Sequence, residues 1–247
     1  MASTQPPAWQ VHPAGTFLGL GQVGRLSARA WPRPFCLVLL KARLCRQDLH
    51  EDMSGGDDLG AILMPTIHDV SQVLGDCSGF YLQQTRRLLN IGIDIDGLAV
   101  SHLAFRTETL VEYLDIRWQL EPLCSANVEN TWGGRPISKL LLEKPLQLSQ
   151  SASTVLIELI APEHQDICQN VYKMGLEHVG IVIGETFVDF GKTYAHLFTG
   201  QQDQGPYCQP YFITFQDNTT VKFYRRSLHD VCVLEGKRFD GFYHVME

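Results

Sequence analysis

Two stretches of the 247-residue chain share one order of predicted elements, and this repeat limits the fold more than any other feature. Each stretch is expected to begin with an apolar strand, continue into an amphipathic helix and end in further strands. His102 and His178 lie 76 residues apart, each one residue into the first strand of its stretch. We therefore predict two related modules, over about residues 98–162 and 175–226.

The first predicted module begins with an alternating strand at residues 100–106. A capping box from Thr109 to Glu112 then indicates the beginning of a helix. The sequence NTWGGRPI predicts a turn, and strands are expected at Ser138–Leu142 and over STVLIELIAP, residues 153–162.

The second predicted module repeats this order. Residues 175–183 (GLEHVGIVI) predict a strand, and residues 185–198 an amphipathic helix. Two further strands, at 211–215 and 219–225, flank a turn at residues 216–218 and predict a hairpin.

Each predicted final strand carries one charge among apolar neighbours, Glu158 in the first module and Lys222 in the second. A buried charge is costly unless an opposite charge, a metal ion or a proton meets it. If an approximate twofold axis relates the modules, His102, His178 and Glu158 converge with Lys222 in one cleft. Two imidazoles and a carboxylate suit Fe(II), Mn(II), Ni(II) or Zn(II), with positions left open for a ligand.

The same residues allow other interpretations. Glu158 and Lys222 could form a buried ion pair, which predicts a non-catalytic, metal-free protein that binds a small molecule. A role in protein interaction through the helical N-terminal part of the domain is a third possibility. The sequence alone leaves all three open.

Two arginines are candidates for binding an anionic ligand. Arg106 follows His102 by four residues, so strand alternation places both on one face, where a guanidinium can hold a carboxylate or phosphate. Arg135 lies in the predicted turn and could act likewise, although turn arginines are usually solvated. If its strand is regular, Glu177 points away from the face that carries His178, and we expect it to lie behind the ligands or at the surface rather than to be a ligand.

Composition narrows the function class. A net charge of −7 argues against a nucleic-acid-binding surface, and no apolar run approaches the ~20 residues that span a bilayer. Seven scattered cysteines without a CxxC spacing indicate buried thiols in a reducing compartment. We therefore expect a cytoplasmic protein with a small-molecule ligand.

The ends of the chain differ from its middle. Residues 1–47 contain six basic residues and no acidic one, as in mitochondrial or plastid transit peptides, so an organelle is the alternative location. We predict a poorly structured leader over residues 1–63 and a helical preface over 64–97. The main domain is expected over 98–235, with a C-terminal tail over 236–247.

Five sequence motifs carry a family resemblance. SHLAFRTE, ENTWGGRPI, IELIAP, GLEHVGIVI and NTTVKFYRRSL occur in this order. Together they resemble the YecM-like family, a branch of the vicinal oxygen chelate superfamily of glyoxalase I, bleomycin-resistance proteins and extradiol dioxygenases. The resemblance covers about residues 64–235. It implies an α+β fold in which paired βαβββ modules form a cup-shaped mixed sheet around a cavity.

The resemblance also implies a site. Metal ligands in the superfamily come from the first and last strands of each module, which correspond to His102, Glu158, His178 and Lys222. Members with four protein ligands usually have a carboxylate where this chain has Lys222, and a cation cannot coordinate a cation. The family is described as metal-binding without an assigned reaction. The resemblance therefore implies a three-ligand metal site, with isomerase, lyase or oxygenase chemistry if the protein is an enzyme.

Overall fold

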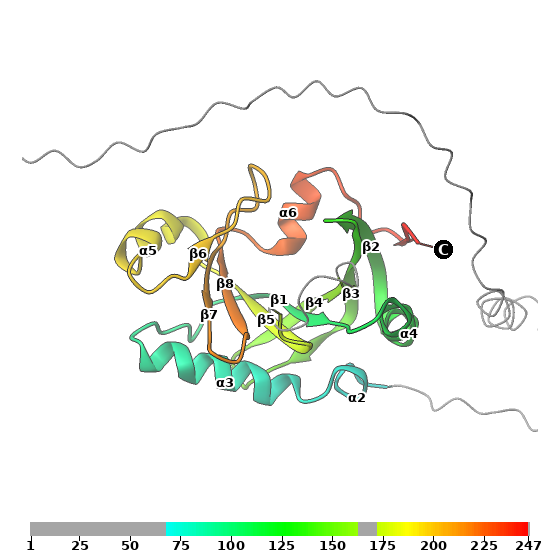
Figure 1. The fold of residues 1–247 in the computed structure, drawn as a ribbon, viewed down its shortest axis with the longest axis horizontal. Coiled ribbons are helices and arrows are strands. Elements are labelled where there is room, and N and C mark those ends of the chain that lie inside the picture. Colours follow the sequence, from blue (N-terminus) through cyan, green and yellow to red (C-terminus); the bar gives the residue numbers. More distant parts are fainter. Residues whose placement is uncertain (1–67, 163–171, 247) are drawn as a thin grey trace, which may run out of the picture. The chain divides into compact units, whose positions relative to one another are not determined.

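The computed structural model describes residues 68–162 and 172–246. In this part of the chain a mixed sheet has the strand order β6-β7-β8-β5-β1-β4-β3-β2-β9 (Figure 1). The strands are β1 (Val100–Arg106), β2 (Cys124–Trp132), β3 (Arg135–Gln147), β4 (Ser153–Ile160), β5 (Gly175–Val182), β6 (Gly200–Gln201), β7 (Tyr211–Thr214), β8 (Thr220–Tyr224) and β9 (Phe242–Tyr243). The α-helices are α2 (Ser71–Leu74), α3 (Cys77–Asn90), α4 (Leu110–Leu120), α5 (Phe187–Thr193) and α6 (Leu228–Leu234). The predicted α+β fold is confirmed.

The register of the central strands shows the relation between the two modules. β1 and β5, the first strands of the two modules, are antiparallel neighbours. On its other side β1 pairs in parallel with β4, and β5 pairs in parallel with β8. β4 and β8 are the last strands of the respective modules. Ala104 is opposite both Glu158 and His178, while Gly180 is opposite both His102 and Lys222. Glu158 and Lys222 therefore occupy equivalent positions in the two modules.

The two faces of the sheet have different neighbours. Helices α3 and α4 lie along one face, and α6 lies over the other (Figure 1). The main core forms on the face that α3 and α4 cover, because alternate strand residues there are apolar and buried. Its strand residues include Leu103, Leu140, Ile157, Leu159, Val179, Ile181, Val221 and Phe223. The histidines alternate with these residues, so they face the α6 side.

The helices and turns match the sequence patterns unevenly. Thr109 Oγ1 accepts a hydrogen bond from the Glu112 amide at 3.1 Å, which confirms the predicted helix beginning. Asn218 has a φ of 63° in the β7–β8 turn, as a tight hairpin requires. The helix expected over 185–198 is shorter, because only the 3₁₀ turn Gly184–Thr186 and α5 are helical.

Arg87 ties α3 to the β7–β8 turn. Its guanidinium donates to both carboxylate oxygens of Asp217, at 3.0 and 2.8 Å, and to Thr219 Oγ1 at 2.8 Å. It also lies over the Phe215 ring, 5.0 Å from the centroid. The hydrogen bonds from Arg87 lower the pKa of Asp217 to about 2 although partial burial opposes this shift.

Replacing Arg87 by methionine is expected to lower the free energy of unfolding by about 1 kcal/mol at pH 7, a value reduced for solvent screening. Because the folded-state pKa of Asp217 is depressed, the ion pair stabilises the fold above pH 4 and loses its effect towards pH 2. Urea unfolding of both proteins should show the difference shrinking between pH 5 and pH 3. Arg86→Met, at an exposed neighbouring position, is the control. A difference that does not change with pH would contradict the assignment.

Candidate metal centre

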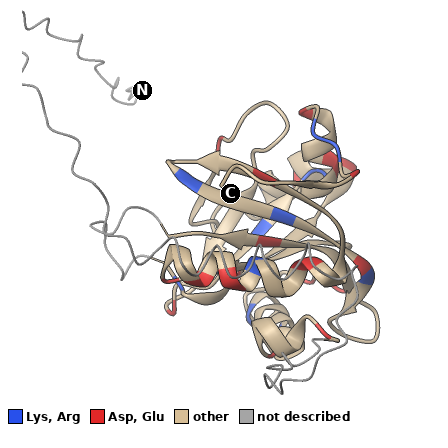
Figure 2. Ribbon diagram, turned by 90° about the vertical axis from the view of Figure 1, so that its right-hand side faces the viewer, with Lys and Arg blue, Asp and Glu red and all other residues tan. Residues whose placement is uncertain are grey.

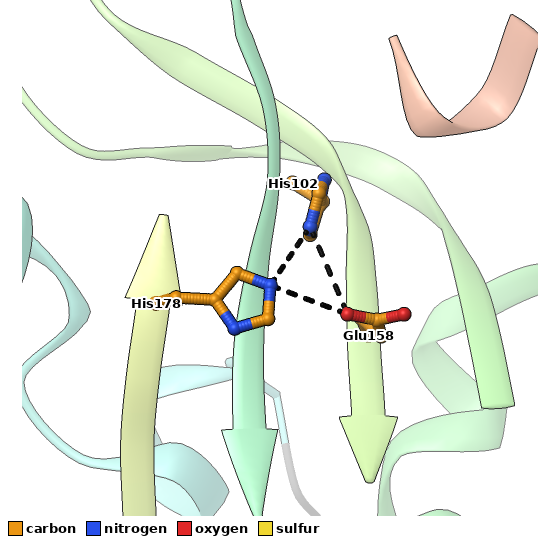
Figure 3. A group of neighbouring side chains, drawn as sticks. All are labelled: His102, Glu158 and His178. Carbon is orange, nitrogen blue, oxygen red and sulfur yellow. Dashed lines mark hydrogen bonds and ion pairs between the residues drawn. The ribbon is translucent and has the colours of Figure 1, made fainter. Parts of the chain in front are cut away.

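Three polar side chains from adjacent strands meet on the α6 side of the sheet (Figure 3). His102 Nε2 lies 3.2 Å from His178 Nε2, and Glu158 Oε2 lies 3.8 Å from the first and 3.3 Å from the second. Both histidine side chains are fully buried, and the Glu158 side chain is 13% exposed. The predicted convergence of these three residues is therefore present.

Small residues make room for the imidazoles. Gly180 lies opposite His102, and a Cβ atom there would come within 2.5 Å of the His102 ring. Ala104 separates Glu158 from His178 across the strands. A larger residue at position 180 would displace the His102 ring, so glycine is required for this arrangement.

A β-bulge precedes each histidine and turns one more side chain towards it. The β1–β5 register shifts between Val100 and His102, and again next to His178. Ser101 Oγ lies 2.9 Å from His102 Nδ1, and Glu177 Oε1 lies 3.6 Å from His178 Nδ1. Regular alternation would point Glu177 away from His178, but the bulge interrupts it. Glu177 therefore lies beside His178, behind the three candidate ligands, and is not one of them.

These two neighbours are themselves held in place. Ser101 Oγ accepts a hydrogen bond from the Leu228 amide of α6 at 2.7 Å, and Glu177 Oε2 accepts one from Arg106 Nε at 2.6 Å. The Arg106 guanidinium lies over the Tyr172 ring, 4.1 Å from the centroid. Its buried Nη1 has no hydrogen-bond partner among the described residues. Arg106 thus orients Glu177 and keeps one donor available.

The protonation states suit metal ligands. Burial lowers the pKa of His102 to about 3, so this imidazole is neutral. Burial opposes ionisation of Glu158, but a hydrogen bond from His178 and nearby positive charge, including Lys139, hold its pKa well below the usual range. Glu177 is likewise anionic despite burial, with a pKa of about 2, because His178 and Arg106 favour the carboxylate. Metal binding requires neutral imidazole and ionised carboxylate ligands.

The donor atoms fit a divalent ion. The three separations between His102, His178 and Glu158 define a triangle with a circumscribed radius of about 2.0 Å, which matches ~2.0–2.2 Å zinc–nitrogen and zinc–oxygen bonds. Ser101 Oγ can accept the Nδ1 proton of His102, which directs the Nε2 lone pair of that ring at the shared point. Glu177 Oε1 lies 3.6 Å from His178 Nδ1, a charge contact without a hydrogen bond. A metal ion at the shared point would replace the proton that His178 donates to Glu158.

The other predicted residues lie around the three ligands. Lys222 is half-buried, and no ion pair joins it to Glu158 among the described residues. The Glu158–Lys222 ion pair of the alternative interpretation is therefore not formed among the described residues. Arg135 is buried at the beginning of β3, with its guanidinium 5.9 Å from the Tyr172 ring centroid. Its position in a strand differs from the solvated turn considered from the sequence.

Lys139 is a site residue that the sequence patterns did not reveal. It lies on β3 directly opposite Glu158 and is buried, and its ammonium group donates to Asn130 Oδ1. β3 was expected to begin only at Ser138, and no partner for Lys139 was visible in the sequence. In the predicted strand, Lys139 lies two residues from Leu141 and therefore on the same face. A lysine on the same face as an apolar residue was the available signal for Lys139.

The rest of the described chain offers no competing centre. His102, Glu158 and His178 are the one group of metal-ligating side chains found within residues 68–162 and 172–246. None of the helices in those ranges is long and apolar enough to cross a membrane. The predicted leader, residues 1–63, lies outside the described residues.

Comparisons with known proteins agree with the sequence motifs. The model of the YecM protein family matches residues 69–222. Among solved structures, a structural-genomics protein, EC4020, is 22% identical, with a TM-score of 0.49 over 68% of this chain and 91% of that chain. No curated protein matches.

Two more distant structures are also similar. A methylmalonyl-CoA epimerase in complex with methylmalonyl-CoA is 11% identical, with a TM-score of 0.36 over 53% of this chain and 96% of that chain. A mutant fosfomycin resistance protein, FosX, from Listeria monocytogenes, complexed with Mn(II) and a dihydroxypropylphosphonic acid, is 10% identical. Its TM-score is 0.20, over 53% of this chain and 94% of that chain. None of these likenesses assigns a reaction to this chain.

Proposed function

The chain belongs to the YecM family, and from this premise we propose that it binds a divalent metal ion through His102, Glu158 and His178. One observation carries the proposal: the two Nε2 atoms and one carboxylate oxygen converge at separations of 3.2 to 3.8 Å. The donor set of two imidazoles and one carboxylate suits Fe(II), Mn(II), Ni(II) or Zn(II). Metal analysis has to determine which of these ions the protein binds.

Three protein ligands leave coordination positions for a small oxygen-rich or anionic molecule. A bound divalent ion supplies Lewis acidity, which polarises a chelated carbonyl or hydroxyl group. Arg106 offers its buried Nη1, and Lys222 and Arg135 add positive charge around the three ligands. This arrangement supports isomerase, lyase or oxygenase-type chemistry on a chelated substrate.

The alternative is a metal-free binding protein in which Glu158 and Lys222 neutralise each other. It has less support, because the described residues contain no such ion pair, whereas the Glu158 carboxylate contacts both histidines. The two histidines, and after them Lys139 opposite Glu158 in the sheet, lower the pKa of Glu158.

Metal analysis of the full chain tests the proposal. Protein purified without a metal-affinity tag should bind one equivalent of Zn²⁺ or Co²⁺ in equilibrium dialysis. His102→Ala and His178→Ala should each lose this binding, while His196→Ala, at an exposed histidine just after α5, should retain it. Stoichiometric binding that survives both His102→Ala and His178→Ala, or no binding to the unmodified chain, would refute the site.

A further inference from the structure

Five adjacent strands each place at least one ionisable side chain on the α6 side of the sheet, in addition to the Arg106–Glu177 pair. In sheet order these strands are β3, β4, β1, β5 and β8. Residues directly opposite one another in neighbouring strands share a face of the sheet. Lys139 is directly opposite Glu158. Lys222 and His102 are both opposite Gly180, so they also share a face. The residues in strand order are Lys139, Glu158, His102, His178 and Lys222. Figure 2 shows basic positions, in blue, within the strands of the sheet.

Neither lysine has an anionic partner of its own. Lys139 is only 5% exposed, and its one printed hydrogen bond goes to the neutral amide oxygen of Asn130. Among the described residues, no carboxylate lies within ion-pair distance of Lys139 or Lys222.

The charges at this face do not balance. Glu177 is neutralised by Arg106, which leaves the Glu158 carboxylate against two ammonium groups. Lys139, Glu158 and Lys222 together therefore carry an excess of one positive charge, and a bound divalent ion would raise the excess of this group to three. Uncompensated charge on a buried face is costly, so a bound ligand that carries at least two negative charges is favoured.

The positions of the lysines constrain where those negative charges lie. β3 and β8 are four strand spacings apart, each about 4.8 Å, with the three ligand-bearing strands between them. Lys139 and Lys222 therefore start from strands on opposite sides of the metal centre. One compact anion on the metal cannot meet both ammonium groups, whereas a molecule with an anionic group at each end can.

Resting on the proposed metal centre, we propose that the ligand is a small dicarboxylate whose hydroxyl or carbonyl oxygen chelates the metal between its two carboxylates. Lys139 and Lys222 bind one end each and act as specificity residues. A monocarboxylate with the same chelating group satisfies only one of them.

Binding of matched hydroxy acids tests this inference. Zn²⁺-loaded protein, with its metal content measured first, is titrated calorimetrically with lactate, malate and tartrate, which share a 2-hydroxycarboxylate. Malate and tartrate should bind at least tenfold more tightly than lactate. Sulfate, a compact dianion, should bind more weakly than malate. Lys139→Met and Lys222→Met should each remove most of the malate preference and leave lactate binding nearly unchanged, whereas Lys192→Met, at an exposed lysine of α5, should change neither.

Several outcomes would overturn the inference. Equal affinity for lactate and malate in the unmodified protein would show that the site does not select two anionic ends. Equal losses for lactate and malate in Lys139→Met would show that this lysine only balances Glu158. If Lys139→Met does not fold, two results still test whether the site selects a dicarboxylate. These are the ligand ranking of the unmodified protein and the effect of Lys222→Met, at a half-buried position. Failure to load Zn²⁺ would instead refute the metal centre itself.

Discussion

Replacing Glu158 by glutamine is expected to weaken divalent metal binding by at least about 100-fold, or roughly 2.7 kcal/mol, while the chain still folds. The substitution keeps the shape of the side chain but removes the negative charge that neutralises part of the ion. Glu158 contributes the one carboxylate oxygen within reach of both imidazole Nε2 atoms, at 3.3 and 3.8 Å. The remaining two histidines then bind the ion without an anionic ligand.

Thermal unfolding with and without metal measures this effect. A ligand that binds only the native state at 100 times its dissociation constant stabilises it by about 2.7 kcal/mol. The melting temperature of the unmodified protein should therefore rise with Zn²⁺ and fall again with a chelator, while Glu158→Gln should show neither change. Glu143→Gln, at an exposed residue of β3, should behave like the unmodified protein. A full metal response in Glu158→Gln would exclude Glu158 as a ligand.

The convergence of the ligands was predictable because it depends on the repeat. His102 and His178 hold equivalent positions in two modules, and the modules meet along those strands. Once the first strands pair, each last strand runs beside the first strand of its own module, which brings Glu158 next to His178 across Ala104. Spacing in the sequence therefore contains the information for the three ligands.

The residues behind the ligands were not predictable, because they depend on breaks in regularity. Period-two alternation places Glu177 on the opposite face from His178, and a β-bulge reverses this. Lys139 becomes a site residue only through the pairing of β3 with β4, which no local pattern specifies. The Gly-Gly pair in NTWGGRPI predicts a turn over residues 130–137, whereas Asn130, which accepts from Lys139, lies in the strand β2.

The buried carboxylate of Glu129, on the face of β2 opposite to that of Asn130, anchors the C-terminal segment. The Glu129 side chain is fully buried and accepts hydrogen bonds from Tyr113 at 2.5 Å and Arg117 at 2.8 Å. Its second oxygen accepts from the backbone amides of Val245 and Met246, at 2.6 and 3.1 Å. The region predicted as a tail is thereby joined to the sheet, where β9 also pairs with β2.

Glu129→Ala is expected to destabilise the fold by about 3–5 kcal/mol, because it removes the acceptor of the Arg117 guanidinium and of four further donors. Burial favours the neutral acid, but hydrogen bonds from Tyr113 and the backbone, with Arg117, lower the pKa of Glu129. Its stabilising effect is therefore complete above the ordinary pKa of 4.5 and declines as the pH falls below it. Urea unfolding at pH 7 should show the full loss, and the difference from the unmodified protein should narrow below pH 4.5.

Hydrogen exchange separates this anchoring from a general loss of packing. The amides of Val245 and Met246 should exchange much faster in Glu129→Ala, even under conditions where the core strand amides stay protected, because their acceptor is the deleted carboxylate. Glu108→Ala, at an exposed glutamate just before α4, should change neither stability nor exchange. Unchanged protection of the two amides in Glu129→Ala would show that β9 pairing alone holds the C-terminal segment, and that the buried carboxylate serves the Tyr113 and Arg117 contacts instead.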